Sequence, residues 1–321
     1  MTTETSGTGR TYRVCEPTLF GNELRYVTKA ILDGDISGKG NYIRLFEEAS
    51  RIKFGANYAI AVNSGSTALL IAMQALGAKK DEEVICPTFT MAAPALAAKM
   101  LGMECRWVDC KKDGTINPQF IEEKITQRTR GIIAVHAYGV PCDMDAIMEI
   151  AKRNGLWVVE DAAEAHGATY KGIPVGTIGD AGCFSFYANK IVTCGEGGMV
   201  ITNDSVLAER CRKIRDYAMS DPYVHEEVAL NGRMSNLAAA VGLAQVEAMN
   251  TLLAARLCIG LMYNHLLEGS GIIVPEFKAG HVNWMYGVRV KNRDEVMQKL
   301  AEEGIETRRY FVPMHKQPFN K

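Results

Sequence analysis

The chain has 321 residues and a mass of 35.2 kDa; 47% of the residues are apolar and 23% are charged. This length favours a large domain with a smaller companion, and the composition excludes a disordered, collagen-like or coiled-coil chain. The 36 basic and 37 acidic residues leave a net charge of -1, so the basic surplus of a nucleic-acid-binding protein is missing. We therefore expect no nucleic acid as a partner.

The cysteines, the histidines and the amino terminus bear on the cellular compartment and on metal binding. The nine cysteines are odd in number and form no C-x-x-C pair, which argues against a disulfide framework or a zinc module. The six histidines show no metal-ligand spacing, so we expect no metal. The first ten residues lack the apolar core of a signal peptide, and no run approaches 18 consecutive apolar residues. The sequence thus predicts a cytoplasmic protein without a membrane partner.

Short apolar runs alternate with helical patterns over the first two thirds of the chain. The runs predicted to be strands are residues 58–62, 83–86, 103–108, 131–136, 156–160, 182–186 and 198–202. Helical patterns cover residues 68–76, 143–154 and 203–218. This alternation predicts an α/β fold with a mostly parallel seven-stranded sheet and helices on both faces.

The pattern changes after residue 220. An irregular polar stretch is followed by a long helical pattern rich in alanine and leucine, residues 237–267. A strand at 282–290, a helix at 293–303 and a strand at 305–312 then predict a small α+β domain. We expect a flexible amino-terminal segment at 1–13, a large domain at 14–254 and a small domain at 255–321.

Polar clusters follow several predicted strands, and ligands of parallel α/β sheets gather at the carboxyl ends of strands. The first cluster, NSGST at residues 63–67, precedes a helix. Its small residues and the helix amino terminus suit a bound anion, while simple capping by a serine explains the pattern equally well.

Two further clusters carry an acid and a lysine. Glu160 and Asp161 end an apolar run, where an acid can hold a protonated pyridine nitrogen or merely cap a helix. Lys190 follows the aromatic-rich segment FSFYA, and a lysine in an apolar cleft has a depressed pKa and can form a covalent bond to a carbonyl group. Lys190 lies 29 residues after Asp161, which is enough chain for both to face one cleft.

A fourth cluster, NGRMS at residues 231–235, precedes the long helix and is explained without a ligand as the entry to that helix. The glycine-rich segment GEGG at 195–198 has neither the G-x-G-x-x-G spacing of a dinucleotide site nor that of a P-loop. A nicotinamide-dependent sugar enzyme with a Rossmann fold is therefore discounted.

The motifs EDAAEAHG at 160–167, FSFYANK at 184–190, GEGGM at 195–199 and NGRMSN at 231–236 occur together and in this order. In this combination the chain resembles the DegT/DnrJ/EryC1/StrS family of pyridoxal-phosphate-dependent nucleotide-sugar aminotransferases, from about residue 14 to residue 317. The resemblance implies the fold type I architecture of pyridoxal 5'-phosphate enzymes, with a smaller α+β domain. It also implies a homodimer with a shared active site.

The resemblance implies a role for each matching residue. Lys190 would bond covalently to the cofactor and move the proton during the reaction, and Asp161 would pair with the pyridine nitrogen. Glu164 would lie near the ring hydroxyl, and Asn231 would reach the phosphate bound by the neighbouring subunit. The residues that would bind the phosphate within the same chain are Gly65, Ser66 and Ser185.

The same resemblance implies the reaction. L-Glutamate would give its amino group to a nucleotide-linked 4-keto-6-deoxysugar, and the motifs are closest to members that convert GDP-4-keto-6-deoxymannose to GDP-perosamine. Lysine at position 190, where related dehydratases carry histidine, favours amino transfer. Arg308 and His315 are the candidates for binding the substrate.

Two positions depart from the family pattern. Met91 stands where many relatives carry an aromatic residue that stacks on the cofactor ring, and its flexible thioether can still cover a ring face. The chain also ends soon after His315, so we expect a shortened small domain. An alternative to the enzyme is therefore a non-catalytic, cofactor-binding dimer or partner protein.

Overall fold

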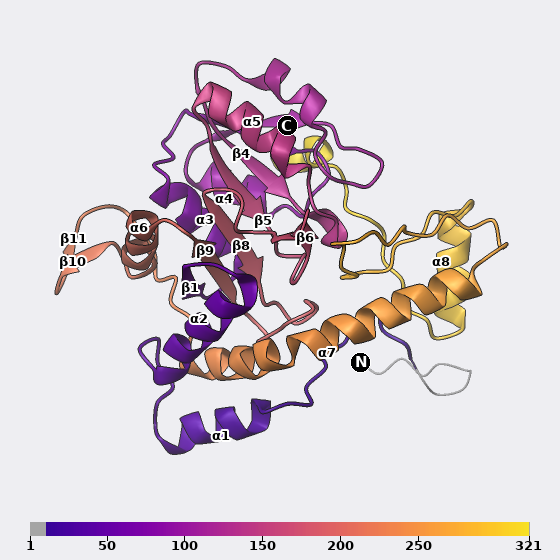
Figure 1. Ribbon diagram of the computed structural model, residues 1–321, viewed down its shortest axis with the longest axis horizontal. Coiled ribbons are helices and arrows are strands. Elements are labelled where there is room, and N and C mark those ends of the chain that lie inside the picture. Colours follow the sequence, from indigo (N-terminus) through magenta and orange to yellow (C-terminus); the bar gives the residue numbers. More distant parts are fainter. Residues whose placement is uncertain (1–10, 321) are drawn as a thin grey trace.

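The structure is a computed structural model that describes residues 11–320. Figure 1 shows a twisted sheet enclosed by helices, with one long helix running out of this body towards a smaller carboxyl-terminal region. Of the predicted flexible segment 1–13, residues 1–10 lie outside the described part.

The centre of the molecule is a seven-stranded sheet with the order β1-β9-β8-β5-β4-β2-β3. Its strands pair in parallel except at β9, which runs antiparallel to both of its neighbours. The predicted fold class is confirmed. The strands are β1 (Tyr58–Val62), β2 (Glu83–Pro87), β3 (Glu104–Val108), β4 (Thr129–Val135), β5 (Trp157–Asp161), β8 (Ala181–Ser185) and β9 (Gly198–Thr202).

The sheet forms because its strands are short apolar runs that can be buried on both faces. β2, β8 and β9 are buried at every position, which is typical of strands covered by helices on either side. The edge strand β3 alternates between exposed and half-buried positions instead. Two short hairpins, β6–β7 (Thr169–Tyr170 and Ile173–Pro174) and β10–β11 (Met219–Asp221 and Val224–His225), lie outside this sheet.

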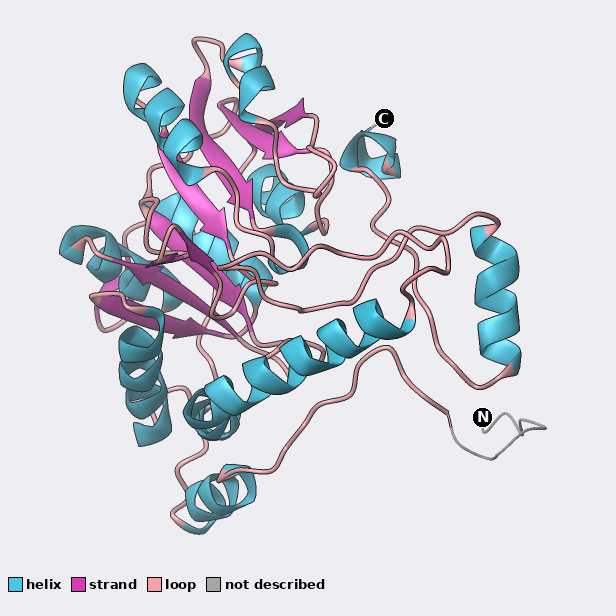
Figure 2. Cartoon of the chain, turned by 45° about the vertical axis from the view of Figure 1, so that its right-hand side comes forward, coloured by secondary structure: helices cyan, strands magenta, loops and turns pink. Residues whose placement is uncertain are grey.

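Helices cover both faces of the sheet (Figure 2). On one face α3, α4 and α6 pack against one core cluster; on the other, α2, α5 and α7 close the remaining core. The helices are α1 (Glu23–Leu32), α2 (Asn41–Phe54), α3 (Gly65–Ala75), α4 (Ala93–Met100), α5 (Met144–Asn154), α6 (Ser205–Arg215), α7 (Asn236–Leu266) and α8 (Arg293–Glu302).

The long helix α7 has 31 residues, and its length and composition alone would suit a membrane span. Half of its most apolar stretch is buried inside the protein, and its first half packs on α1 and α2. This is the environment of a core helix. The predicted domain boundary between residues 254 and 255 falls within α7, which continues through it without a break.

The carboxyl-terminal region differs from the prediction. The helix expected at 293–303 is present as α8, but the expected strands at 282–290 and 305–312 are wrong. Each segment makes only an isolated bridge among the described residues, Ile273 to Arg289 and Tyr12 to Ile305. The two segments meet through side chains instead, with the hydroxyl of Tyr310 seated where a side chain on Gly287 would lie. Alternating apolar residues therefore pack here without a hydrogen-bonded ladder.

Candidate active site

The candidate site lies at the carboxyl edge of the sheet, where the segments after β1, β2, β4, β5 and β8 meet. In a parallel sheet this edge is where ligands bind. Lys190 follows β8, Asp161 ends β5, and the predicted phosphate-binding segment follows β1. The topology thus brings together the clusters that sequence spacing alone could not place.

Lys190 is half-buried, although its amino group carries a charge at neutral pH in an ordinary setting. Burial lowers the pKa of its amino group, while the charges of Glu164, Asp161 and Cys15 act in the opposite direction. Its Nζ atom lies over the indole ring of Trp284, 4.0 Å from the ring centroid. The lysine is therefore an amine held in an apolar cleft, as predicted from the aromatic residues that precede it.

Two buried acids lie near this lysine. Burial raises the pKa of Asp161, and the amide of Ala163 donates to its Oδ1 over 3.1 Å. Burial also raises the pKa of Glu164 to about 7, and the amide of Tyr138 donates to its Oε2 over 2.8 Å. Lys190 pulls both pKa values back down, so the three groups form one electrostatic unit.

The neighbouring acid Glu160 belongs to the fold and not to this unit. Its carboxylate accepts hydrogen bonds from the amides of Gly176, Ile178 and Gly179 and contacts Nε2 of His136 at 2.9 Å. Burial raises its pKa, but the histidine and the amides outweigh this effect and the pKa is lowered. Alternation along β5 places one acid in the loop network and the next in the site.

The start of α3 provides a compact polar cradle. Ser64 caps the helix by accepting from the amide of Thr67 over 3.1 Å, which confirms the capping interpretation. In the described part of the chain, the amides of Gly65 and Ser66 have no acceptor, as expected at the first turn of a helix. A Cβ on Gly65 would lie 2.8 Å from that of Ser185, so α3 and the end of β8 touch here.

Glycine is also required at the first residue of β9. A Cβ on Gly198 would lie 2.2 Å from the carbonyl oxygen of Ser64 and 2.7 Å from the amide nitrogen of Gly65. The segment GEGG therefore lets β9 pass directly beneath the cradle. Backbone amides, the hydroxyl of Ser185 and the helix dipole together suit a phosphate group.

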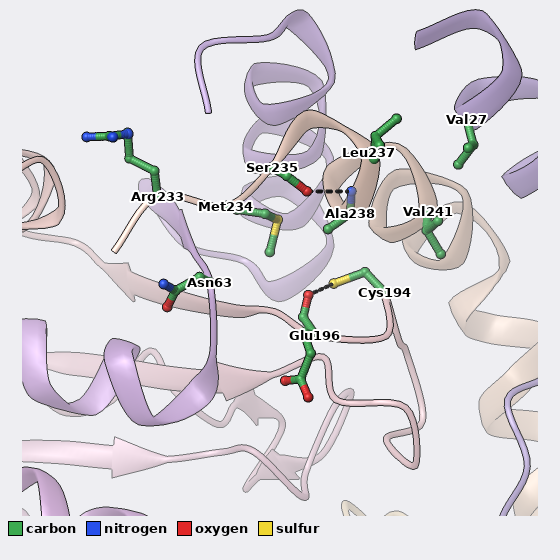
Figure 3. A pocket seen from close by; sticks show the side chains of 10 residues that line it. All are labelled: Val27, Asn63, Cys194, Glu196, Arg233, Met234, Ser235, Leu237, Ala238 and Val241. Carbon is green, nitrogen blue, oxygen red and sulfur yellow. Dashed lines mark hydrogen bonds between the residues drawn. The ribbon is translucent and has the colours of Figure 1, made fainter. Parts of the chain in front are cut away.

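Asn231 lies at the same edge but points elsewhere. Its side-chain oxygen accepts from the amide of Arg233 over 3.1 Å, and its carbonyl oxygen accepts from Asn63 over 3.2 Å. Figure 3 shows Asn63 and Arg233 beside a cavity of about 500 Å³ that is bounded by the start of α7, by Val27 of α1 and by Glu196. This cavity adjoins the cradle and does not contain Lys190.

Three predicted site residues are not part of the buried group. Met91 is half exposed after β2, where its sulfur accepts from the amide of Ala93. Arg308 is exposed and forms an ion pair of 3.3 Å with Glu306. His315 is exposed on the 3-10 turn Met314–Lys316.

Sequence reasoning missed the aromatic wall of the site. Tyr138 follows β4 with a φ of 53° and lies between the rings of Phe89, Trp284 and Tyr310 at centroid distances of 4.9 to 5.9 Å. Tyr138 could have been found because it follows the carboxyl end of β4, where ligands of parallel sheets gather. No local signal marked Trp284, because its segment was interpreted as a strand.

These features fit pyridoxal 5'-phosphate: a half-buried lysine with a lowered pKa, a buried acid with one oxygen that accepts no hydrogen bond from the described residues, and a cradle for a phosphate. Together with the parallel sheet, they define the class of fold type I pyridoxal-phosphate enzymes. The chain belongs to the DegT/DnrJ/EryC1/StrS aminotransferase family, whose sequence profile matches residues 18–321. It is accordingly an aminotransferase that uses pyridoxal phosphate and acts on a nucleotide sugar with an amino donor.

Curated relatives and solved structures agree with this assignment. The chain is 42% identical to GDP-perosamine synthase of Caulobacter vibrioides, over 95% of this chain and 85% of that protein. It is 40% identical to GDP-perosamine synthase of Escherichia coli O157:H7, over 95% and 86%. It superimposes on DesV of Streptomyces venezuelae, crystallised with a ketimine intermediate, with a TM-score of 0.88, 35% identity and coverage of 93% and 82%.

Proposed function

We propose that the protein transfers the amino group of L-glutamate to GDP-4-keto-6-deoxymannose and releases 2-oxoglutarate and GDP-perosamine. The observation that carries this proposal is the similarity to GDP-perosamine synthases over nearly the whole chain, combined with Lys190 beside the buried acids Asp161 and Glu164. Nothing in the comparisons supports the alternative of a non-catalytic, cofactor-binding protein.

Lys190 is the residue that bonds the cofactor and moves the proton. When bound, pyridoxal phosphate supplies a carbonyl carbon that carries the amino group and a ring that takes up the electron pair of the broken C–H bond. The lowered pKa of Lys190 increases the fraction of neutral amine, which alone can accept a proton from carbon. The same amine returns that proton at the second carbon.

Asp161 and Glu164 set the protonation of the site. Asp161 has one oxygen engaged by Ala163, and its other oxygen is available to hold the proton of a pyridine nitrogen. Glu164 would lie near the ring hydroxyl of the bound cofactor, where its pKa of about 7 would permit it to hold or release a proton during turnover.

The remaining residues bind and enclose the ligands. Gly65, Ser66 and Ser185 would hold the phosphate, and the thioether of Met91 would cover one face of the ring. Asn231 completes the phosphate site of the neighbouring subunit, which makes the enzyme a homodimer with shared sites. Substrate recognition is assigned to Arg308 and His315 of the carboxyl-terminal segment, both of which are exposed to solvent.

We also propose a two-domain organisation, with residues 14–254 holding the cofactor and residues 255–321 forming the smaller domain. The enzyme works in the cytoplasm, where its free cysteines stay reduced.

The experiment that tests this function has two parts. The purified protein should absorb near roughly 410–430 nm with pyridoxal phosphate, and borohydride should fix the cofactor on the peptide that contains Lys190. Lys190→Ala should lose both signals, whereas Lys171→Ala, at an exposed lysine paired with Asp145, should keep them. A borohydride-fixed adduct on another lysine would refute the assignment.

The second part identifies the substrate. Glutamate should first convert the protein to its amino form, and GDP-, UDP- and dTDP-linked 4-keto-6-deoxysugars are then compared by the rate at which each one restores the starting spectrum. The GDP sugar should react fastest. A faster reaction with another base would contradict the proposed substrate and leave the aminotransferase assignment intact.

A further inference from the structure

The indole of Trp284 stands against the amino group of Lys190. Trp284 is only 5% exposed, and the lysine Nζ lies 4.0 Å from its ring centroid. Among the described residues, Lys190 forms no ion pair within 4 Å, so the ring face is the group in direct contact with its charge. A cation over an indole face is attracted by the negative potential of the ring, and more strongly where water is excluded.

The other edge of the same indole holds the backbone from which the lysine side chain starts. Nε1 of Trp284 donates to the carbonyl oxygen of Asn189 over 3.0 Å. The thiol of Cys15 donates to this carbonyl as well, over 3.3 Å. The peptide that precedes Lys190 is therefore held by two donors from distant parts of the chain.

Arg256 of α7 closes this arrangement into a ring of contacts. Its Nη1 donates to the carbonyl oxygen of Trp284 over 2.7 Å, and its Nη2 contacts the sulfur of Cys15 at 3.4 Å. The ring of Tyr138 also lies 5.4 Å from the indole. The indole is thus held through its N–H group, its backbone carbonyl and a neighbouring ring, which leaves it little freedom to follow a moving lysine.

We propose that Trp284 is a positioning residue for Lys190. Its ring face holds the ammonium group in the cleft whenever the lysine is not bonded to the cofactor, and its N–H group fixes the carbonyl of Asn189, so that the amine stays directed at the site. This inference rests on the proposed role of Lys190. The other charged or titratable groups that face the pair are Asp161, Glu164, His166, Cys15, Arg256 and Tyr138.

The contact between Lys190 and Trp284 can be followed by tryptophan fluorescence, because the chain has only three tryptophans and two of them can be replaced. In the full-length Trp107→Phe/Trp157→Phe variant, Trp284 is the only tryptophan. After removal of the cofactor with hydroxylamine, its emission should titrate with a midpoint below the ordinary lysine pKa of about 10.4. Adding Lys190→Met should abolish this transition while the other titrating groups remain. An unchanged titration with methionine at position 190 would overturn the proposal.

The second measurement separates positioning from a merely structural role. Pyridoxal phosphate should bond to Lys190 about tenfold more slowly in Trp284→Leu than in the wild type. Trp284→Phe, which restores an aromatic face, should recover most of that rate, and both variants should reach the same final amount of adduct. Equal rates in the leucine and phenylalanine variants would overturn the inference. Absence of any adduct on Lys190 in the wild type would instead overturn the proposed function.

Discussion

Replacement of Asp161 by asparagine tests the electrostatic design of the site with a change of a single atom. The amide of Ala163 already donates to one carboxylate oxygen, over 3.1 Å. The asparagine carbonyl should keep this bond, which leaves its NH₂ group directed at the ligand. A donor then faces the pyridine nitrogen, and the nitrogen can accept this bond only after it has lost its proton.

The size of the effect follows from the bond that is lost. A hydrogen bond with a charged partner contributes about 1.5–3 kcal/mol, which corresponds to about 10- to 150-fold in rate when it stabilises the transition state. Stability should change little. Burial disfavours the carboxylate form of Asp161, so a neutral amide removes a desolvation cost while it keeps the bond to Ala163.

The assay is single-turnover conversion of the bound cofactor by glutamate, followed spectroscopically at saturating glutamate. Asp180→Asn is the matched control, because Asp180 accepts from the amide of Val158 at the opposite end of β5. The control should keep the wild-type rate. A rate for Asp161→Asn within about threefold of the wild type would refute the proposed pairing with the pyridine nitrogen.

Three further predictions follow from buried or shared groups. Both ring nitrogens of His166 lack partners in the described structure, and burial lowers the pKa of this histidine to about 3. Below about pH 6.5 the unfolded chain binds a proton on this histidine that the folded protein does not, so the free energy of unfolding decreases. Urea unfolding should show a loss of about 2 kcal/mol between about pH 7 and pH 5, and His166→Phe should abolish this loss. Glu164→Gln should flatten the dependence of turnover on pH around its pKa of about 7, and an unchanged pH profile would assign that ionisation to another group. Asn231→Asp should place a negative charge beside a phosphate, weaken cofactor retention and shift the dimer towards monomer in sedimentation; a wild-type monomer that keeps its cofactor would contradict the shared site.

The core of the fold could be predicted from the sequence because its signals are local. The run 198–202 has an apolar centre, Met199 to Ile201, between Gly198 and Thr202, and its boundaries agree with β9. Residues 282–290 carry a similar apolar pattern, but a strand also needs a neighbour that pairs with its backbone. The segment has only an isolated bridge in the described structure, and no local pattern reveals that.

The same distinction holds for the site. Lys190 and Asp161 lie at ends of recognisable strands, which makes them candidates, and the resemblance to a known family then assigns their roles. Trp284 lies 94 residues beyond Lys190 and reaches it through tertiary packing, which the pattern of residues 282–290 does not encode. Glu160 and Asp161 are adjacent and both follow the same apolar run. Because side chains alternate along β5, Glu160 binds the amides of the 176–179 loop, whereas Asp161 faces the candidate active site.

The uninterrupted course of α7 restricts how the molecule can move. At 1.5 Å per residue, its 31 residues form a rod of about 46 Å, with its first half embedded beside the sheet. Such a rod offers no hinge between residues 254 and 255, and Arg256 connects it to both Trp284 and Cys15. A displacement of the outer end of α7 would therefore move Arg256 and, through it, Trp284, whose ring faces the amino group of Lys190.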